Sequence, residues 1–340
     1  MRWIVTGALG FIGKNLILRL LANGDYVVGI DRKSLEAESV FAKELERVGT
    51  ENFELHQTDM TEPLNLKFGR WFSTDGFAEH DVLVHLAARS GIKECYEDFS
   101  GALSDNIFVT ANLLQGAAEY GISRFVFASS GAVVGNALLT HTTEGSAIQP
   151  SNVYGGMKAA AEQLCRGFWA EHGLQSTILR FSNVYGPHSQ HKQSVANRFI
   201  RDALAGKTLE VHGDGTQRRD FVFVEDVVEA IIAGGVQEFQ VPEPQVFHVS
   251  SGQETAILHD ATGSSLYDVI CEALGGEELP FVLVDSDPGV KAASLDSQKL
   301  RVVCSLDDPK PLSYGIKQTV RWYQQLALGV ASNLKNPHDA

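Results

Sequence analysis

The stretch that decides the fold is Thr6-Gly7-Ala8-Leu9-Gly10-Phe11-Ile12-Gly13. It directly follows the predicted strand Trp3–Thr6 and opens a predicted helix at 11–23. Glycines allow a tight turn and let a diphosphate approach the backbone, and the helix N-terminus adds free N–H groups and partial positive charge. The stretch therefore predicts a site for a dinucleotide. Its expected contacts are Gly7, Gly10, Phe11, Ile12 and Gly13.

Acidic and small residues at the ends of later strands extend this site. Asp31 ends the predicted strand Tyr26–Asp31, where a carboxylate can bind both ribose hydroxyls of an adenosine and would repel a 2′-phosphate. This favours NAD over NADP, although Arg32 follows directly and keeps NADP as the alternative. The ends of the next two predicted strands are expected beside the adenine and where the dinucleotide crosses the sheet edge. The residues there are Asp59 and Met60, then Leu86, Ala87 and Ala88.

Short runs of β-branched residues alternate with helical patterns through the first half of the chain. The predicted strands are 3–6, 26–31, 53–58, 82–86, 125–128 and 177–180, and helices lie near 11–23, 36–48, 103–120 and 153–172. Strands apolar on both faces and separated by helices are typical of a parallel sheet covered on each side. We therefore predict an α/β protein with a Rossmann-type, doubly wound parallel sheet and a smaller mixed carboxy-terminal domain.

The domain boundaries follow the change of rhythm after Phe181. Residues 1–180, with a return segment at about 220–250, are expected to form the NAD-binding domain, and 181–219 with 251–340 the substrate domain. Helical patterns return at 195–205, 226–234, 264–274 and 315–327. Gly, Pro, His and Gln cluster at 186–194 and 206–219, which predicts loops there, and 253–263 is predicted to be a surface loop.

The composition of the 340 residues excludes several classes of function. The formal net charge of −14 argues against nucleic acid or an anionic membrane as a partner, since both need a basic surface. No stretch reaches the roughly 18 apolar residues that a spanning helix needs. The four cysteines stand far apart without a CxxC pair, which predicts free thiols, no metal site and a cytoplasmic location.

Tyr154 and Lys158 form the predicted catalytic pair. They stand four residues apart at the start of a helix and so share one face. A tyrosine titrates near pH ~10, and an ammonium one turn away, with a positive nicotinamide ring nearby, is expected to lower that pKa. Ser130, 24 residues before Tyr154, is expected to hydrogen-bond the same substrate oxygen. Tyr154 is therefore the predicted base toward a sugar hydroxyl, and Ser129 is interpreted as a loop hydroxyl.

These motifs together resemble those of the extended short-chain dehydrogenase/reductases and, within them, the NAD-dependent sugar-nucleotide epimerase/dehydratase family. The resemblance continues through Asp105-Asn106-Ile107, Leu179–Pro187, Gly213-Asp214-Gly215 and Arg219-Asp220-Phe221. It implies an enzyme with NAD as cofactor and a nucleotide-diphosphate sugar as substrate. It also implies a homodimer, formed through the helices that carry Asn106 and Tyr154.

The resemblance also implies roles for single residues. Arg219 is expected to bind the substrate's diphosphate, to which a permanently charged, forked guanidinium is suited. Asn183 is expected to bond the phosphate or nucleotide, and Val195 with Leu209–Val211 to frame the base. A basic residue at the position of Lys93 is implied to meet a sugar carboxylate or phosphate, although exposed lysines usually only add solubility. Further cofactor contacts are expected from Asn106, Ala128 and Phe181.

The resemblance leaves the reaction partly open. Family members that dehydrate sugars carry an Asp-Glu pair after the catalytic Ser or Thr, where this chain has Gly131 and Ala132. We therefore expect an isomerase: a 4-epimerase in which Tyr154 removes the C4 hydroxyl proton, hydride passes to NAD, the 4-keto sugar rotates and hydride returns. The alternatives are an NAD-dependent dehydratase or 4-keto reductase of a nucleotide sugar and a non-catalytic dinucleotide-binding scaffold.

Three features depart from the family pattern. Val134 stands where a tyrosine is common, and Asp287 stands where many relatives have an arginine for diphosphate, so that either Lys291 substitutes or the substrate differs. Gly155 and Gly156 lie in the first turn of the catalytic helix, where each costs about 1 kcal/mol relative to alanine.

Overall fold

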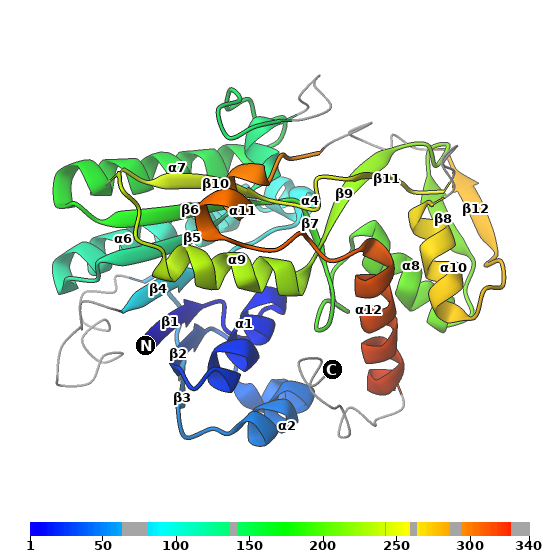
Figure 1. Ribbon diagram of the computed structural model, residues 1–340, viewed down its shortest axis with the longest axis horizontal. Coiled ribbons are helices and arrows are strands. Elements are labelled where there is room, and N and C mark those ends of the chain that lie inside the picture. The colour runs from blue at the N-terminus through cyan, green and yellow to red at the C-terminus, as the bar shows by residue number, and fades with distance from the viewer. Residues whose placement is uncertain (63–80, 136–141, 242, 259–263, 286–293, 328–340) are drawn as a thin grey trace.

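The computed structural model describes residues 1–62, 81–135, 142–241, 243–258, 264–285 and 294–327. Its centre is a seven-stranded sheet in the order β10-β6-β5-β4-β1-β2-β3, in which every neighbouring pair is parallel (Figure 1). The strands are β1 (Arg2–Thr6), β2 (Tyr26–Asp31), β3 (Phe53–Gln57), β4 (Val82–His85), β5 (Arg124–Ser130), β6 (Gln175–Phe181) and β10 (Gln245–Val249). The predicted α/β Rossmann-type class is confirmed.

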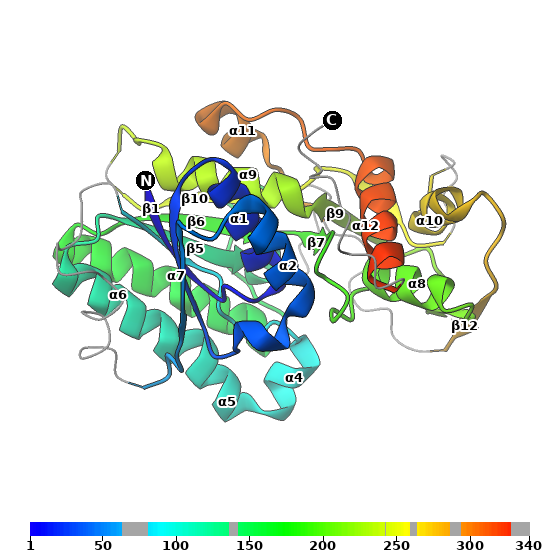
Figure 2. The same ribbon diagram turned by 90° about the horizontal axis from the view of Figure 1, so that it is seen from below.

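Helices cover both faces of this sheet. One face carries α1 (Phe11–Ala22), α2 (Ser39–Val48) and α9 (Val224–Val236), and the other carries α6 (Val109–Tyr120) and α7 (Val153–His172). Figure 2 shows the two layers on either side of the strands. A sheet buried on both faces needs strands that are apolar throughout, which explains the unbroken β-branched runs of the sequence.

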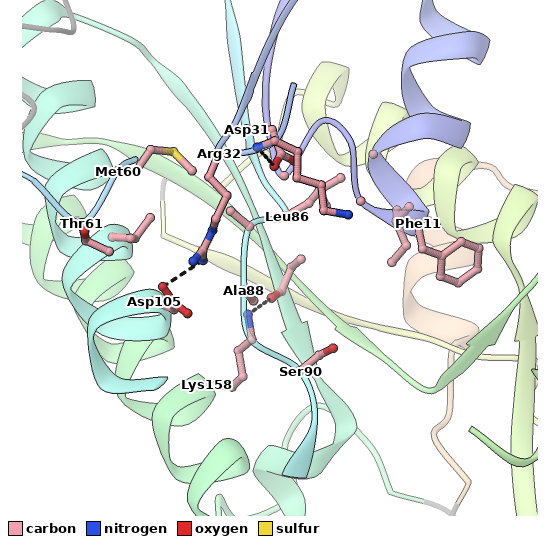
Figure 3. Close-up of a pocket in the computed structure, with 18 of the residues that line it drawn as sticks. Phe11, Asp31, Arg32, Met60, Thr61, Leu86, Ala88, Ser90, Asp105 and Lys158 are labelled. Atoms are coloured by element: carbon pink, nitrogen blue, oxygen red, sulfur yellow. Dashed lines mark hydrogen bonds and ion pairs between the residues drawn. The ribbon is translucent and has the colours of Figure 1, made fainter. Parts of the chain in front are cut away.

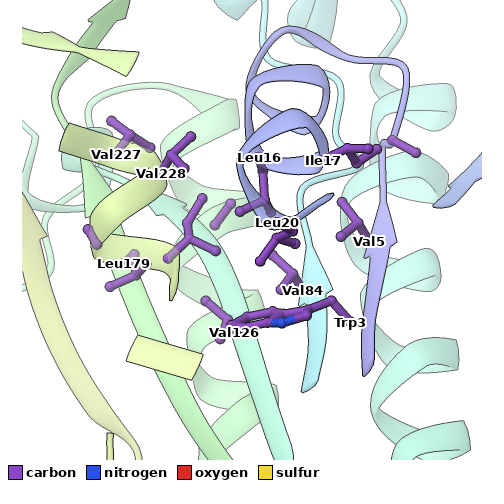
Figure 4. Packing of buried hydrophobic residues seen from close by; sticks show 14 of the residues in the cluster. Trp3, Val5, Leu16, Ile17, Leu20, Val84, Val126, Leu179, Val227 and Val228 are labelled. Atoms are coloured by element: carbon purple, nitrogen blue, oxygen red, sulfur yellow. The ribbon is translucent and has the colours of Figure 1, made fainter. Parts of the chain in front are cut away.

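Alternate residues of the strands supply the two cores. Val5, Val84 and Val126 point toward α1 and α9, where they pack with Leu16, Leu20 and Val227 (Figure 4). Their neighbours Ile4, Leu83 and Phe125 point the other way and pack on α6 and α7. The period of two along each strand therefore fixes the strand ends relative to the helices that follow them.

A smaller part of mixed structure lies beside the carboxyl end of the central sheet (Figures 1 and 2). Its three-stranded sheet has the order β11-β9-β7, and a second sheet pairs β12 with β8 in parallel. A cluster that includes Tyr185, Phe199, Phe223 and Val320 forms its core. The elements are β7 (Asn183–Tyr185), β8 (Leu209–His212), β9 (Arg218–Phe223), β11 (Glu254–Ala256), β12 (Phe281–Val284), α8 (Val195–Leu204), α10 (Leu266–Leu274) and α12 (Leu312–Ala327).

Short connecting elements complete the described chain. Between β4 and α6 the chain forms α4 (Ile92–Glu97), α5 (Phe99–Leu103) and the π-helical turn η2 (Ser104–Phe108). The others are η1 (Leu35–Ala37), η3 (Gly131–Val134) and α11 (Gln298–Cys304). None of the helices in the described ranges is both long and apolar enough to cross a membrane.

Two predicted loops contain strands, so those predictions were wrong. The segment 206–219 includes β8, whose Leu209 and Val211 are buried while Glu210 is exposed. The segment 253–263 includes β11, after which Ile257 and Leu258 are buried rather than on the surface. Polar residues at the ends of such three- and four-residue strands outweigh the short apolar alternation in the sequence. Residues 259–263 of the second segment lie outside the described residues.

Candidate active site

The glycine turn between β1 and α1 is closed in a way that only glycine permits. Gly7 has a φ of +70°, and a Cβ there would lie 2.8 Å from the backbone N of Ala87. A Cβ on Gly13 would lie 2.2 Å from the carbonyl O of Gly7. The first turn of α1 and the end of β4 therefore approach this loop backbone to backbone. This leaves the N-terminus of α1 open to an anion.

A cavity of about 310 Å³ extends from this turn along the carboxyl ends of the strands (Figure 3). Sixteen of the predicted cofactor contacts line it, drawn from the ends of β1, β2, β3, β4, β5 and β6 and from α1 and α7. They are Gly7, Gly10, Phe11, Ile12, Gly13, Asp31, Arg32, Asp59, Met60, Leu86, Ala87, Ala88, Ala128, Tyr154, Lys158 and Phe181. An elongated pocket with a glycine cradle at one point and an acid beyond it has the shape and chemistry to hold a dinucleotide.

Asp31 and Arg32 face the cavity with their charges already engaged. The Asp31 carboxylate accepts hydrogen bonds from the backbone N–H of Leu9 at 2.9 Å and of Lys33 at 3.1 Å. The Arg32 guanidinium donates to the carboxylate of Asp105 at 2.9 Å, as the dashed line in Figure 3 marks. Asp105 also accepts from the Nε of Arg89 at 3.1 Å. The arginine that left NADP open is thus held by a carboxylate across the pocket.

Asn106, a predicted cofactor contact, does not line the cavity. Its side chain is buried, its Oδ1 accepts from the backbone N–H of Arg89 at 2.9 Å and its Nδ2 donates to the carbonyl O of Arg89 at 3.0 Å. An amide that closes both bonds on one residue has little left for a ligand. The structure therefore corrects this placement: Asn106 positions the segment after β4.

Tyr154 and Lys158 reach the cavity from the first turns of α7. The Lys158 Nζ donates to the carbonyl O of Ala128 at 2.8 Å and lies 4.7 Å from the centre of the Phe127 ring. Asn152 caps the helix, since its Oδ1 accepts from the backbone N–H of Gly155 at 2.9 Å. The predicted pair therefore shares one face of α7 at the end of β5.

The pKa of Tyr154 moves opposite to the expected direction. Burial raises it to about 12, although an interaction with the Ser130 side chain opposes the rise. Burial also lowers the pKa of Lys158 to about 8. Both shifts have the same cause, which is loss of water around a group that must carry charge. The expectation that Lys158 together with a nicotinamide ring lowers the phenol's pKa stays a prediction, and the shift described here comes from burial of the phenol.

The two serines at the end of β5 have different partners. The Ser130 Oγ accepts from the backbone N–H of Ala132 at 3.2 Å, and its interaction with Tyr154 brings it to the predicted position beside the phenol. The hydroxyl of Ser129, interpreted from the sequence as a loop hydroxyl, is buried and donates to Glu162 at 2.5 Å. Glu162 also pairs with Arg180 at 2.8 Å. These buried bonds of Glu162 join α7 to β5 and β6, and so fix the position of Tyr154 relative to the ends of the two strands.

A second cavity, of about 330 Å³, lies in the smaller part of the molecule. Three predicted substrate contacts line it: Asn183, Val195 and Arg219. Val211 lines it from β8, as predicted, whereas Leu209 is fully buried and does not. Burial lowers the pKa of Arg219, but a guanidinium stays charged at neutral pH all the same. A cation at the end of a partly apolar pocket suits a nucleotide with its phosphates.

Several polar residues of this second cavity were missed from the sequence. Arg198 lies in α8, where its guanidinium contacts His212 at 3.0 Å and donates to the carbonyl O of Glu210 at 2.7 Å. The Gln217 side chain donates to the carbonyl O of His212 at 2.8 Å. The amphipathic pattern of 195–205 predicts that Arg198 lies on a helix. The sequence does not show which side of that helix faces a pocket, because this depends on the position of β8.

Lys93, predicted to meet a sugar carboxylate or phosphate, is placed elsewhere. Its side chain in α4 is 87% exposed, lies 3.7 Å from Glu97 and lines neither of these cavities. Two basic residues that the sequence did not single out line the first cavity instead, His191 and Lys192. Burial lowers the pKa of His191 to about 4, so its ring is uncharged at neutral pH and Lys192 is the cation of the two. The Lys192 Nζ donates to the hydroxyl of Ser90 at 2.9 Å.

The departures from the family pattern have structural counterparts in part. Val134 is buried and packs with Val133, Ala159 and Leu295, where it fills a small core. A Cβ on Gly155 would lie 2.4 Å from the carbonyl O of Ala132, so a close approach of α7 to η3 requires glycine there. Asp287 and Lys291 lie outside the described residues.

In the residues that are described, no cluster of ligands could hold a metal ion, and the four cysteines are free.

Known proteins match nearly the whole chain. A sequence model described as the NAD dependent epimerase/dehydratase family matches residues 3–250. A UDP-glucose 4-epimerase of Mycolicibacterium smegmatis is 31% identical, over 95% of this chain and 99% of that protein. A dTDP-D-glucose 4,6-dehydratase of Mus musculus is 29% identical, over 95% of this chain and 89% of that protein. A solved UDP-glucuronic acid 4-epimerase of Bacillus cereus, in complex with UDP-glucuronic acid and NAD, has a TM-score of 0.82 at 26% identity and covers 96% of this chain and 100% of its own.

Proposed function

Because the chain belongs to the NAD dependent epimerase/dehydratase family, we propose that it is an NAD-dependent 4-epimerase of a nucleotide-diphosphate sugar. The family expected from the sequence motifs is the family that the comparisons show. The observation that carries the proposal is that Tyr154 and Lys158 line the glycine-turn cavity with Ser130 beside the Tyr154 phenol. Ser130 is followed by Gly131 and Ala132, where a dehydratase would need an acid and a base.

The residues of the first cavity are suited to NAD. The close approach at Gly7 leaves room for a diphosphate beside the N-terminus of α1, and Asp31 offers carboxylate oxygens toward a ribose. Because the Arg32 guanidinium is already bonded to Asp105, it is less available to the 2′-phosphate of NADP, and this favours NAD as the cofactor. When bound, NAD would supply a reversible hydride acceptor and a positively charged ring.

The role proposed for Tyr154 is to take the proton of the C4 hydroxyl and to return it in each cycle. At neutral pH the phenol keeps its proton, because its pKa is about 12, so it becomes a base only when positive charge next to it favours the phenolate. Lys158 is mostly an ammonium at neutral pH, because its pKa is about 8, and its bond to Ala128 holds it in the cavity. Ser130 would bond the same substrate oxygen and fix it for transfer.

The geometry favours epimerisation over dehydration. Gly131 and Ala132 open η3 directly after Ser130 and can neither donate nor accept a side-chain proton. The carboxylates that line the cavity are Asp31, Asp59 and Asp105, and each already accepts hydrogen bonds from protein groups. None of the three follows the catalytic serine. The second cavity, with Arg219, would hold the nucleotide and its diphosphate while the sugar rotates.

The test is to incubate the protein with UDP- and dTDP-hexoses and to follow the configuration at C4 by NMR. We expect inversion at C4 without loss of water and without net consumption of NAD, and loss of water or stoichiometric consumption of cofactor would overturn the proposal. Tyr154→Phe should lower turnover by roughly 10²–10⁴-fold while NAD binding is retained. Tyr26→Phe is the matched control, because Tyr26 begins β2 and lines neither cavity.

We also propose that the protein is a homodimer. The support is the family resemblance, together with large apolar side chains that are exposed on neighbouring elements: Tyr96 at 75%, Phe99 at 50% and Phe108 at 56%. Exposed apolar groups on adjacent elements are typical of a surface that is covered in an assembly. Light scattering of the purified protein measures its mass, and a monomer at micromolar concentration would contradict this proposal.

A further inference from the structure

Lys192 is a cation in the first cavity that the proposed reaction does not use. It lies in the loop between β7 and α8, whereas the rest of the cavity comes mainly from the central sheet. Its ammonium reaches across to the Ser90 hydroxyl at 2.9 Å. Ser90 stands two residues after Ala88, and Figure 3 shows it at the Lys158 end of the cavity, away from Asp31 and Met60. Through Ser90, Lys192 therefore borders the part of the cavity that holds Lys158, where the proposed reaction requires the sugar, although it also feels the charge of Lys33 beyond Asp31.

The loop that carries Lys192 is held in place by bonds from several elements. The Arg201 guanidinium of α8 donates to the carbonyl O of Gln190 at 2.7 Å and of Lys192 itself at 2.6 Å. The backbone N–H of Lys192 donates to Ser189 at 2.8 Å, and the Ser189 hydroxyl lies 3.0 Å from that of Tyr323 in α12. An ammonium on such a backbone is already in position before a ligand arrives, which lowers the entropy cost of binding one.

The charges around Lys192 leave it short of negative partners. Among the described residues no carboxylate lies within ion-pair distance of its Nζ; Glu94 acts on it only from farther away, and Lys33 opposes its charge. Burial lowers the pKa of Lys192, because the ammonium has lost water without gaining an ion pair. A partly buried cation of this kind is stabilised by an anion that enters the cavity.

The other anions of the proposed ligands already have sites. The glycine turn and the N-terminus of α1 face a cofactor diphosphate, and Arg219 lines the separate cavity proposed for the substrate's diphosphate. On the proposed function, we propose that Lys192 binds a carboxylate on the sugar, so that the protein selects sugar nucleotides of the uronate type over neutral ones. Lys192 is thus a specificity residue, and it takes the role that the sequence assigned to Lys93.

The test compares two ligands that differ only at C6 of the sugar. The NAD-loaded protein is titrated with UDP-glucuronate and with UDP-glucose in a calorimeter. We expect tighter binding of UDP-glucuronate, and we expect Lys192→Met to weaken it by about ten- to a hundredfold, the range of one charge-assisted hydrogen bond, with UDP-glucose nearly unchanged. Lys192→Arg should restore part of the preference. Lys93→Met removes an equal charge from the exposed face of α4 and should keep the wild-type ratio.

Each other outcome overturns the inference in a recognisable way. Equal weakening of both ligands would assign Lys192 to the substrate's diphosphate, and weaker NAD binding would assign it to the cofactor. Loss of the preference in Lys93→Met would return the role to Lys93. A thermal melt of each variant separates these results from misfolding, and Ser90→Ala, which removes only the partner of Lys192, gives an independent second variant. Because the readout is binding, a wild-type protein that prefers UDP-glucuronate but inverts no sugar would contradict the proposed function and leave this inference standing.

Discussion

The two cavities are built by opposite means. The first is shaped by backbone: at Gly7 and Gly13 the chain passes so close to its neighbours that a Cβ would lie 2.8 and 2.2 Å from backbone atoms. The second is shaped by side chains from separate segments, such as Asn183 after β6, Arg198 on α8 and Arg219 on β9. The first should therefore be most sensitive to an added atom, and the second to the removal of a functional group.

The largest effect is expected from one methyl group in the backbone-built cavity. Gly13→Ala places a Cβ against the carbonyl O of Gly7 and Ala8, so α1 or the glycine turn must move. We expect the free energy of unfolding to fall by about 1–3 kcal/mol, and NAD affinity to fall about tenfold or more, since a loss of ~1.4 kcal/mol corresponds to tenfold. Chemical denaturation and calorimetric titration with NAD measure the two effects.

Gly167→Ala is the matched control for this change. Gly167 also lies within a helix, but it is exposed on α7 and nothing lies within 4 Å of the added Cβ. The variant should keep NAD affinity and gain up to about 1 kcal/mol of stability. Equal NAD binding by the wild type and Gly13→Ala would show that the turn tolerates a shift, and the contrast between the two cavities would then fail.

The backbone-built cavity was largely predictable from the sequence, because the glycines that make it sensitive to an added atom also form a recognisable sequence pattern. Glycine spacing, strand ends and the acid at Asp31 are local patterns, and the sheet register carries them to one edge. Local sequence patterns could not show which partners the side chains bond. Asn106 closes on Arg89 rather than on a ligand, and Arg32 is bonded to Asp105 from a segment 73 residues away.

The second prediction removes a group from the side-chain-built cavity. Arg219→Met deletes the guanidinium proposed to bind the substrate's diphosphate, and should weaken UDP binding by about ten- to a hundredfold. NAD affinity should stay the same, because Arg219 lines only the second of the two cavities. Arg218→Met is the comparison: Arg218 donates to the carbonyl O of Glu254 at 2.9 Å and does not line this cavity. A parallel loss of NAD affinity in Arg219→Met would mean that the cavities are not independent.

The side-chain-built cavity was less predictable, and its errors have a common cause. Asn183, Val195 and Arg219 came from the family resemblance, whereas Arg198 and Gln217 carry no motif and depend on which strand lies beneath them. That strand, β8, was hidden in a stretch interpreted as loop. Sequence spacing likewise shows a lysine near Tyr154 but not how much water the fold removes from the phenol, and this loss of water raises the phenol's pKa.

The smallest expected effect separates two adjacent glycines of the catalytic helix. A Cβ on Gly155 would lie 2.4 Å from the carbonyl O of Ala132, whereas a Cβ on Gly156 would meet nothing within 4 Å. Gly156→Ala should therefore raise the free energy of unfolding by about 0.5–1 kcal/mol, through the lower backbone entropy of the unfolded chain. Gly155→Ala should lower stability and turnover together, since α7 must move away from η3 and carry Tyr154 with it. Thermal melts and initial rates of the two variants decide the matter: an equal gain of stability in both would mean that helix propensity, not close approach, governs this turn.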